Sequence, residues 1–373
     1  MRRKLLAALA VGTATLLALS ACSDSGGDTT TPGQSSGGGA AGGTVGIILP
    51  DAASSPRWET YDRPLLKAAF EAAGLKTDIQ NAGKDVGKFQ TIADGMISAG
   101  VKALLIVNLD NESGSAVIKK ATDAGIPTVD YDRLTLGGGA KYYVSFDNVK
   151  VGTAIGTGLV KCLQDDGKKP ADGGIVELNG SPTDNNATQF KQGYDKVIRG
   201  AGYSVVADQA VPDWDPIVAG TLFAQIDTQQ KGKYVGVAAA NDNLGGAVVA
   251  RLKPQGLAGK IPVTGQDAGD EGLQRVLLGT QCVSVYKSVK KEAAAAADIT
   301  TKMINGDTAG ADAIATAITK DTKLNKDVKS VLLDPQAIYQ DNVMDVINDG
   351  ATTATKLCTT AALKKACKDH GVS

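Results

Sequence analysis

The chain has 373 residues with 39 Lys and Arg against 40 Asp and Glu, and this near balance excludes the basic surface that nucleic-acid binding needs. Its length exceeds what one hydrophobic core usually organises, and with 43% hydrophobic residues it can bury two. The only histidine is His370, so histidine-based zinc sites and Ser-His or Cys-His catalytic pairs have almost no residues to form from.

Residues 1–22 have the pattern of an export signal. Three basic residues at positions 2–4 precede an apolar run from Leu5 to Leu19, which is too short and wrongly flanked for a spanning helix. Leu19-Ser20-Ala21-Cys22 resembles a bacterial lipobox, in which the cysteine is acylated and becomes the new N-terminus. We predict a lipoprotein signal peptide over 1–22 with Cys22 lipidated; the alternative is an ordinary secretory signal.

Residues 23–43 contain no Leu, Ile, Val or aromatic residue and are rich in Gly, Ser and Thr. Such a segment cannot contribute to a core, so we predict a flexible tether. The folded body is then expected to begin at Thr44. It would be held by lipid on the outer face of the cytoplasmic membrane, or be periplasmic if the source is Gram-negative.

From Thr44 onward, short apolar runs alternate with helical periods, which is typical of an α/β fold with parallel sheets. A strand, an Asn/Asp loop and a helix start occur at 106–117 and again at 239–248, which favours two comparable lobes. Ligands of such sheets collect at the carboxyl ends of strands. Buried strands are predicted at residues 45–49, 103–107, 175–178, 234–238 and at Val263.

Four cysteines remain in the exported body, where thiols tend to pair. Three pairings are possible, and we favour Cys162 with Cys282 and Cys358 with Cys367; the alternative is four buried free thiols. Cys358 and Cys367 would lie too far apart on one continuous helix, so their pairing requires a bend between them. Neither interpretation makes these cysteines catalytic.

No motif gives a positive catalytic signal. The sequence has neither a P-loop nor a GxSxG nucleophile elbow, and no pair of carboxylates is distinguished by its spacing. We therefore expect no enzyme, no cofactor and no metal site.

The two tryptophans both follow strands and both have charged neighbours. Trp58 lies in Pro56-Arg57-Trp58-Glu59, and Trp214 lies in Asp213-Trp214-Asp215. An indole face beside Arg and Asp suits a sugar, because its C–H face stacks on the ring while charged groups bind its hydroxyls. The alternative is a loop tryptophan that fills a surface gap. Two tryptophans in matching places favour a ligand.

Other polar motifs also follow predicted strands. Asp132 and Arg133 form one such pair, for which a surface ion pair is the alternative. Residues 181–186 and 265–267 bring further Asp, Asn and Gln side chains, and turn or helix-cap chemistry is the alternative there.

Taken in order, the motifs form a joint pattern that is more specific than any one of them. They are Arg57-Trp58, Tyr131-Asp132-Arg133, Ser145-Phe146-Asp147-Asn148, Gly180-Ser181-Pro182-Thr183-Asp184-Asn185-Asn186-Ala187, Asn241-Asp242, Gly265-Gln266-Asp267-Ala268 and Val285-Tyr286-Lys287. This order resembles the D-xylose-binding proteins of ABC importers, in the pentose and hexose group of periplasmic sugar-binding proteins. The likeness runs from about Thr44 to about Gly350.

The chain departs from that family at two places. The segment around Arg57-Trp58 is displaced by one residue relative to Asp62-Arg63. The tail beyond Gly350, with Cys358 and Cys367, has no recognised counterpart.

The resemblance implies a type I periplasmic binding protein fold: two Rossmann-like lobes with parallel sheets, joined by a three-segment hinge. One lobe would take residues 44–146 and 287–330, and the other 147–286 and 331–373 with the tail. It also implies a ligand site with no catalytic residue. The implied ligand-binding residues are Arg57, Trp58, Asp132, Arg133, Asp184, Asn186, Trp214, Asn241, Asp267 and Lys287.

By the same resemblance, the protein would be a monomer that captures xylose or a related aldose and delivers it to an ABC permease and its ATPase. Two alternatives remain open at this point. One is a sugar-sensing protein that reports to a signalling receptor. The other is an exported carbohydrate-processing enzyme that uses Asp132, Asp184 or Asp267 as acid or base.

The lipidation prediction can be tested by cell fractionation. We expect the parent protein in the membrane fraction and Cys22→Ala in the soluble extracytoplasmic fraction, since the variant lacks the thiol that is acylated. A Cys22→Ala variant that stays with the membrane like the parent would refute the lipid anchor.

Overall fold

The computed structural model describes residues 42–372. The predicted signal peptide, the predicted lipidation site Cys22 and nearly all of the predicted tether lie outside the described residues. Within 42–372, no helix is long and apolar enough to cross a membrane.

The N-terminal lobe is built on a seven-stranded sheet of order β11-β12-β5-β4-β3-β1-β2. All neighbours are parallel except the antiparallel pair β11 and β12. The strands are β1 Thr44–Leu49, β2 Lys76–Asn81, β3 Ala103–Ile106, β4 Thr128–Tyr131, β5 Tyr142–Phe146, β11 Ala317–Asp321 and β12 Lys326–Leu333.

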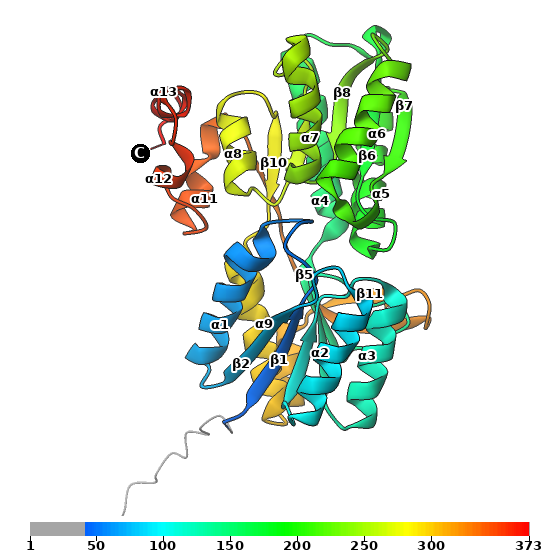
Figure 1. Cartoon of the computed structure of the whole chain (residues 1–373), viewed down its shortest axis with the longest axis vertical. Coiled ribbons are helices and arrows are strands. Elements are labelled where there is room, and N and C mark those ends of the chain that lie inside the picture. The colour runs from blue at the N-terminus through cyan, green and yellow to red at the C-terminus, as the bar shows by residue number, and fades with distance from the viewer. Residues whose placement is uncertain (1–41, 373) are drawn as a thin grey trace, which may run out of the picture. The chain divides into compact units, whose positions relative to one another are not determined.

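Helices cover both faces of this sheet (Figure 1). Apolar side chains of α1 and α9 pack on one face and those of α2 and α3 on the other, so the lobe has two cores. The helices are α1 Arg63–Ala72, α2 Val86–Ser98, α3 Asn111–Asp123, α9 Val289–Ile304 and α10 Thr308–Ile314.

The C-terminal lobe contains two three-stranded sheets, of order β7-β6-β8 and β13-β10-β9. A parallel bridge between Val237 and Val263 joins β8 to the residue before β9. The strands are β6 Gly174–Asn179, β7 Val205–Ala210, β8 Tyr234–Ala239, β9 Thr264–Gln266, β10 Val283–Tyr286 and β13 Gln336–Ile338. The long helices are α4 Asn148–Asp165, α5 Asn185–Gly200, α6 Pro216–Gln229, α7 Asp242–Leu252 and α8 Asp270–Leu277.

Short helices complete the described chain. After β13, a C-terminal segment (residues 340–372) folds onto α8, where its apolar side chains share one core with Leu273, Val276 and Leu277. The segment contains η5 Gln340–Asn342, α11 Met344–Asn348, α12 Ala354–Leu357 and α13 Ala361–Asp369. The other short helices are the π-helical turn η1 Trp58–Asp62 and the 3-10 turns η2 Pro170–Asp172, η3 Pro212–Trp214 and η4 Lys253–Gln255.

The predicted α/β fold of two lobes with parallel sheets is confirmed. The strands predicted at 45–49, 103–107, 175–178 and 234–238 are present, each within one residue of its predicted ends. Val263 forms only the bridge to Val237, and the strand proper begins at Thr264.

The chain passes between the lobes three times: after β5, after β10 and after β12. The third passage comes later than predicted. β12 continues past residue 330 to Leu333, because its last residues pair with β5 up to Phe146.

The structure pairs the cysteines in the way favoured from the sequence. Cys162 of α4 is bonded to Cys282, just before β10, with their Cα atoms 6.4 Å apart. Cys358 is bonded to Cys367 with a Cα separation of 6.1 Å. The bend that this second bridge requires lies between α12, which ends at Leu357, and α13, which begins at Ala361.

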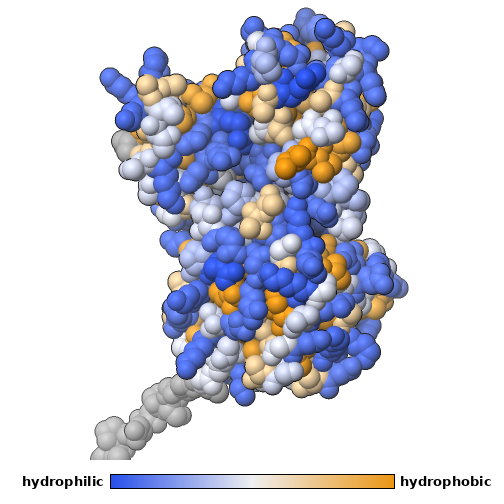
Figure 2. Space-filling model, in the orientation of Figure 1, coloured by the Kyte–Doolittle hydropathy of each residue, from blue (hydrophilic) through white to orange (hydrophobic). Residues whose placement is uncertain are grey.

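Large apolar side chains exposed among the described residues are scattered. Figure 2 shows orange groups within a largely hydrophilic surface on one face of the molecule. The exposed large apolar side chains are Val86, Val149, Ile217, Val218, Leu278, Ile318 and Leu324.

Glycines allow helices α4 and α5 to pack backbone against backbone. A Cβ added at Gly152 of α4 would lie 2.0 Å from the carbonyl oxygen of Phe190 in α5. A Cβ at Gly193 of α5 would lie 2.4 Å from the carbonyl oxygen of Val149. This contact fixes α5 against α4, and α5 carries Asn186 and Phe190, which line the space between the lobes.

Gly152→Ala should therefore lower the free energy of unfolding by about 1 to 3 kcal/mol or more, since neither backbone can give way cheaply. Gly95→Ala is the matched control. Gly95 is also inside a helix, but nothing lies within 4 Å of its added Cβ, so helix propensity should raise stability by about 0.5 to 1 kcal/mol. Urea denaturation measures both, and equal effects at the two positions would contradict the packing argument.

Candidate functional site

One cavity between the lobes collects the polar side chains that follow the strands. All ten residues predicted to bind ligand line it, and the lobes lie so close together that the cavity volume is only about 20 Å³, which is room for about one water molecule. Four further residues line the cavity that were not predicted to bind ligand: Ser54, Ser55, Phe190 and Gln266.

Arg57 is the most heavily paired cation of the cavity. It donates four hydrogen bonds, two to Asp62, one to Asp132 and one to Glu292, at 2.7 to 2.9 Å. A guanidinium has five N–H groups, so one is left for a ligand. Arg57 was expected to serve the ligand, but most of its hydrogen bonds hold the N-terminal lobe together at η1, β4 and α9.

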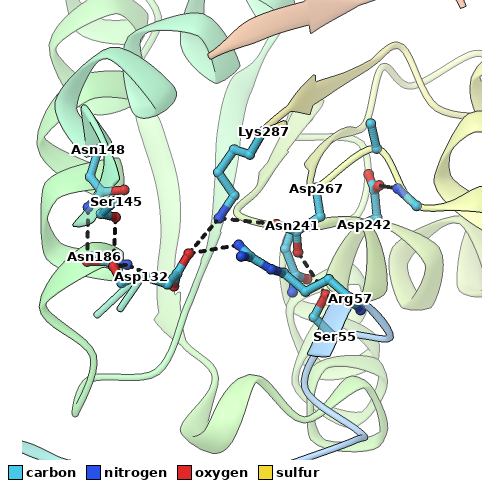
Figure 3. A network of polar contacts seen from close by, with 12 residues as sticks. Ser55, Arg57, Asp132, Ser145, Asn148, Asn186, Asn241, Asp242, Asp267 and Lys287 are labelled. Atoms are coloured by element: carbon cyan, nitrogen blue, oxygen red, sulfur yellow. Dashed lines mark hydrogen bonds and ion pairs between the residues drawn. The ribbon is translucent and has the colours of Figure 1, made fainter. Parts of the chain in front are cut away.

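Asp132 is held in an uncommon backbone conformation just after β4. Its φ of 60° lies in the left-handed region, which non-glycine residues adopt mainly where surrounding contacts enforce it. The Asp132 carbonyl oxygen accepts hydrogen bonds from Tyr143 Oη, Ser145 Oγ and Asn186 Nδ2 at 2.7 to 2.9 Å. These contacts aim the carboxylate into the cavity (Figure 3).

Positive charges keep the Asp132 carboxyl ionised. Burial alone would raise its pKa, but Lys287, Arg57 and Arg133 together lower the pKa of Asp132 to about 2. Near neutral pH it is therefore a hydrogen-bond acceptor and has no proton to give.

Asn186 links the two lobes. Its Nδ2 donates to the Asp132 carbonyl oxygen, and its Oδ1 accepts from Asn148 Nδ2 at 2.9 Å. Asn186 was predicted as a direct ligand residue, and its amide is largely engaged in holding Asp132.

Asp184 connects the second tryptophan to the other arginine. Its carboxylate lies 3.0 Å from Arg133 Nε and accepts a hydrogen bond from Trp214 Nε1 at 3.1 Å. Burial raises the pKa of Asp184 despite the charge of Arg133. The Trp214 indole packs so closely on Gly180 that a Cβ there would lie 2.0 Å from the ring.

Trp58 has a different environment. Its Nε1 donates to Ser54 Oγ at 3.2 Å, and the guanidinium carbon of Arg57 lies 4.5 Å from the ring centroid. A cation already lies over this ring, so Trp214 is the better candidate for stacking on a ligand.

Asp267 and Lys287 complete the contacts across the cavity. Asp267 accepts a hydrogen bond from Ser55 Oγ of the N-terminal lobe at 2.9 Å, and Lys287 Nζ lies 3.2 Å from its Oδ1. Lys287 also lies 3.6 Å from Asp132. Asn241 Nδ2 donates to the Ser54 carbonyl oxygen at 3.2 Å. Side chains of one lobe thus bond directly to the other.

Asp242 supports the loop that carries Asp267. It accepts hydrogen bonds from Gly269 N and Ser284 Oγ, and Ser284 Oγ in turn accepts from Ala268 N. Asp267 and Ala268 both have positive φ, so the loop depends on these bonds for its conformation. Burial raises the pKa of Asp242 to about 6.

One buried polar atom of the cavity lining has neither a hydrogen bond nor an ion pair among residues 42–372. It is Gln266 Oε1. Buried polar groups are normally satisfied, so this acceptor calls for a ligand or water. Arg133 Nε and Asp267 Oδ1 are instead held in ion pairs, with Asp184 and Lys287.

The segment around Arg57-Trp58, predicted to be displaced by one residue, contains the π-helical turn η1. A π turn closes with i→i+5 hydrogen bonds and so holds one residue more than an α turn. Both Arg57 and Trp58 reach the cavity while Asp62 stays at the start of α1.

Two carboxylates of the site were missed from the sequence. Asp62 was noted only as a reference point, and Glu292 lies inside the helical pattern of α9, far from any strand end. No local signal marks Glu292, because its role comes from packing beside Arg57. Burial raises the pKa of Glu292 well above its ordinary value, although Arg57 opposes this. No group of His, Cys, Asp and Glu suited to a metal ion occurs in the part of the chain that the structure describes.

Known proteins are similar to this chain in sequence and in fold. The periplasmic binding protein domain family matches residues 45–308. The D-xylose-binding periplasmic protein of Escherichia coli (strain K12) is 34% identical over 79% of this chain and 86% of its own length. The multiple sugar-binding periplasmic receptor of Rhizobium radiobacter is 32% identical over 83% and 90%.

A solved structure shows the same fold. It is an ABC transporter solute-binding protein from Clostridium phytofermentans with bound β-D-glucose, which is 24% identical to this chain. The match covers 84% of this chain and 99% of that one, with a TM-score of 0.75.

Below the site, Asp130 fixes the turn that presents Arg133. Its carboxylate accepts hydrogen bonds from Thr135 N and Thr135 Oγ1 at 2.8 and 2.7 Å. Thr135 Oγ1 also accepts from Asn108, whose carbonyl oxygen receives Arg133 Nη1. Burial raises the pKa of Asp130 to about 7, although the bonds from Thr135 oppose it.

This shift predicts a pH dependence of stability. Between about pH 4 and 7 the folded protein holds a proton at Asp130 that the unfolded chain has lost. The resulting contribution of Asp130 to the free energy of unfolding is full below about pH 4 and is lost as pH rises through 7. Asp130→Asn should remove this contribution. The free energy of unfolding of the parent should therefore fall by up to roughly 4 kcal/mol more than that of the variant across this range.

Urea denaturation at several pH values measures this difference, with exposed Asp123→Asn as the control. Parallel pH curves for the parent and Asp130→Asn would contradict the shifted titration.

Proposed function

Because the chain belongs to the periplasmic binding protein family, we propose that it is an extracytoplasmic lipoprotein that captures a monosaccharide between two closing lobes. It then delivers the sugar to an ABC permease and its ATPase. D-xylose is the first candidate, since two relatives at 34% and 33% identity are D-xylose-binding proteins. The protein acts as a monomer and needs no cofactor.

The observation that carries this proposal is the set of polar side chains from both lobes that line one cavity. Arg133 offers N–H donors, Asp132 and Asp267 offer carboxylate acceptors, and the Gln266 Oε1 acceptor has no partner among the described residues. Each hydroxyl of a sugar can donate and accept, so a polyol can satisfy both kinds at once. Trp214 adds an aromatic wall on which the C–H face of a pyranose can stack.

Capture follows from the division of the site between the lobes. Asp132 and Arg133 come from the N-terminal lobe, while Asp184, Trp214 and Asp267 come from the C-terminal lobe. A sugar that contacts both sets gains its full binding energy only when the lobes are together, so it favours the closed arrangement. The direct bonds between lobes, such as Ser55 to Asp267, would be partly exchanged for bonds to the sugar.

The pairing of the carboxyl groups favours binding over hydrolysis. A glycosidase needs one carboxyl group free to act as general acid, whereas Asp132 is paired with Arg57, Asp184 with Arg133 and Asp267 with Lys287. The names of the similar proteins describe binding and reception.

A second candidate is a sugar sensor that reports to a signalling receptor. The Rhizobium radiobacter relative is named a periplasmic receptor, which is the observation in its favour. Both candidates use the same sugar site and differ only in the protein that recognises the closed form.

Isothermal titration with D-xylose, D-glucose, D-ribose and D-allose tests sugar binding. Trp214→Ala should weaken binding of the preferred sugar by about 1 to 3 kcal/mol, through lost stacking and buried area. Trp214→Phe keeps a ring but not the bond to Asp184, so it should recover part of the loss. Asp267→Ala should reduce the binding free energy at least as much as Trp214→Ala, because it leaves buried hydroxyls of the sugar without a hydrogen-bond acceptor.

Lys119→Ala, on the exposed face of α3, is the control and should bind like the parent. If Trp214→Ala and Asp267→Ala, verified as folded, bind every tested sugar as the parent does, the site is wrong. If the parent binds none of a wide panel of pentoses and hexoses, the function is wrong.

A further inference from the structure

The C-terminal segment lies against the two parts of the chain that present Asp267 and Lys287. It begins after the end of the family match at residue 308. Its apolar side chains form one core with α8, with Ala268 and with Tyr286 of β10. Ala268 follows Asp267 and Tyr286 precedes Lys287, so this core lies directly behind both charged residues.

One carboxylate of the segment contacts both neighbours of Lys287. Asp349 accepts hydrogen bonds from Tyr286 Oη at 2.6 Å and from Ser288 Oγ at 2.5 Å. Burial alone would raise the pKa of Asp349, but these two hydrogen bonds and nearby lysines lower it below its ordinary value. Asp349 is therefore a charged acceptor for both hydroxyls.

Lys287 itself faces the other way. Its side chain is 4% exposed, and its ammonium lies between Asp267 and Asp132 in the cavity, at 3.2 and 3.6 Å. Successive residues of an extended chain point to opposite sides. The hydrogen bonds from Tyr286 and Ser288 to Asp349 thus hold both neighbours of Lys287 on one side, so the Lys287 side chain is directed to the other side, into the cavity.

A second contact supports the loop on the other side. Thr352 Oγ1 donates to Asp270 Oδ1 at 2.5 Å, and Thr352 is buried. Asp270 opens α8 directly after the strained Asp267–Gly269 turn.

We propose that the C-terminal segment is part of the binding machinery and that Asp349 is a positioning residue for Lys287. Asp349 does not touch the sugar. By holding Tyr286 and Ser288, it keeps the Lys287 ammonium where it pairs with Asp267 and Asp132, and so keeps both carboxylates aimed at the sugar. This inference rests on the proposed sugar-binding function.

Two substitutions at Asp349 separate its acceptor role from its charge. Asp349→Ala removes the acceptor and should weaken affinity for the preferred sugar about tenfold, the order expected when two hydrogen-bonded hydroxyls are released. Asp349→Asn keeps a carbonyl oxygen for them and should stay within about twofold of the parent. Asp345→Ala is the matched control, since the exposed Asp345 carboxylate accepts hydrogen bonds from Gln336 and Asn342 and none from Tyr286 or Ser288.

A double-mutant cycle with Lys287→Met distinguishes positioning from general destabilisation. If Asp349 acts through Lys287, Asp349→Ala should change affinity by less than about twofold in the Lys287→Met background. Titration up to millimolar sugar keeps the weakened variants measurable.

Equal losses from Asp349→Ala in both backgrounds would overturn the positioning role, as would parent-like affinity in a folded Asp349→Ala protein. Failure of the proposed function is recognised separately, because then the parent itself binds no sugar.

Discussion

Asp132 is the buried charge on which the geometry of the cavity depends. A carboxylate removed from water is costly unless cations and donors surround it. Here Arg57 supplies a hydrogen bond, while Lys287 and Arg133 supply charge. Each of these cations has a second partner: Asp62 and Glu292 for Arg57, Asp184 for Arg133, and Asp267 for Lys287. The requirement to neutralise one anion thus organises elements from both lobes around it.

Three residues around the cavity have an unfavourable backbone conformation. Asp132, Trp214 and Asp267 all have positive φ, a conformation that side chains other than glycine adopt at a cost of about 1 to 3 kcal/mol each. Hydrogen bonds from outside the residue enforce this conformation at two of the three: Tyr143 and Ser145 bond to the Asp132 carbonyl, and Asp242 acts through Ser284 behind Asp267. The carboxylates of Asp132 and Asp267 are therefore held in place around the cavity by the surrounding fold.

The strands and the side chains that follow them could be predicted from the sequence, because local patterns determine both. Apolar runs gave the strands, and Asp132, Asp184, Asn241 and Asp267 all lie at strand ends where they line the cavity. The supporting residues could not be found that way. Glu292 has the pattern of an ordinary helix residue, and Asp349 follows the short helix α11, where no strand ends. Their roles arise from tertiary contacts between distant parts of the chain, which no local pattern records.

The disulfide between Cys162 and Cys282 bears on how the lobes can move. It joins α4, which follows the first passage between lobes, to the start of β10, which precedes the second. These two elements are thus held together within the C-terminal lobe. In the N-terminal lobe, the same two passages connect to β5, which pairs with β12, and to α9, which packs on the sheet. If the lobes move relative to each other, the backbone dihedral angles have to change in the few residues between these elements. Those residues include Asp147 and Lys287, and Lys287 bonds to Asp132 in one lobe and Asp267 in the other. The ion pairs of Lys287 therefore join the hinge itself to both walls of the cavity.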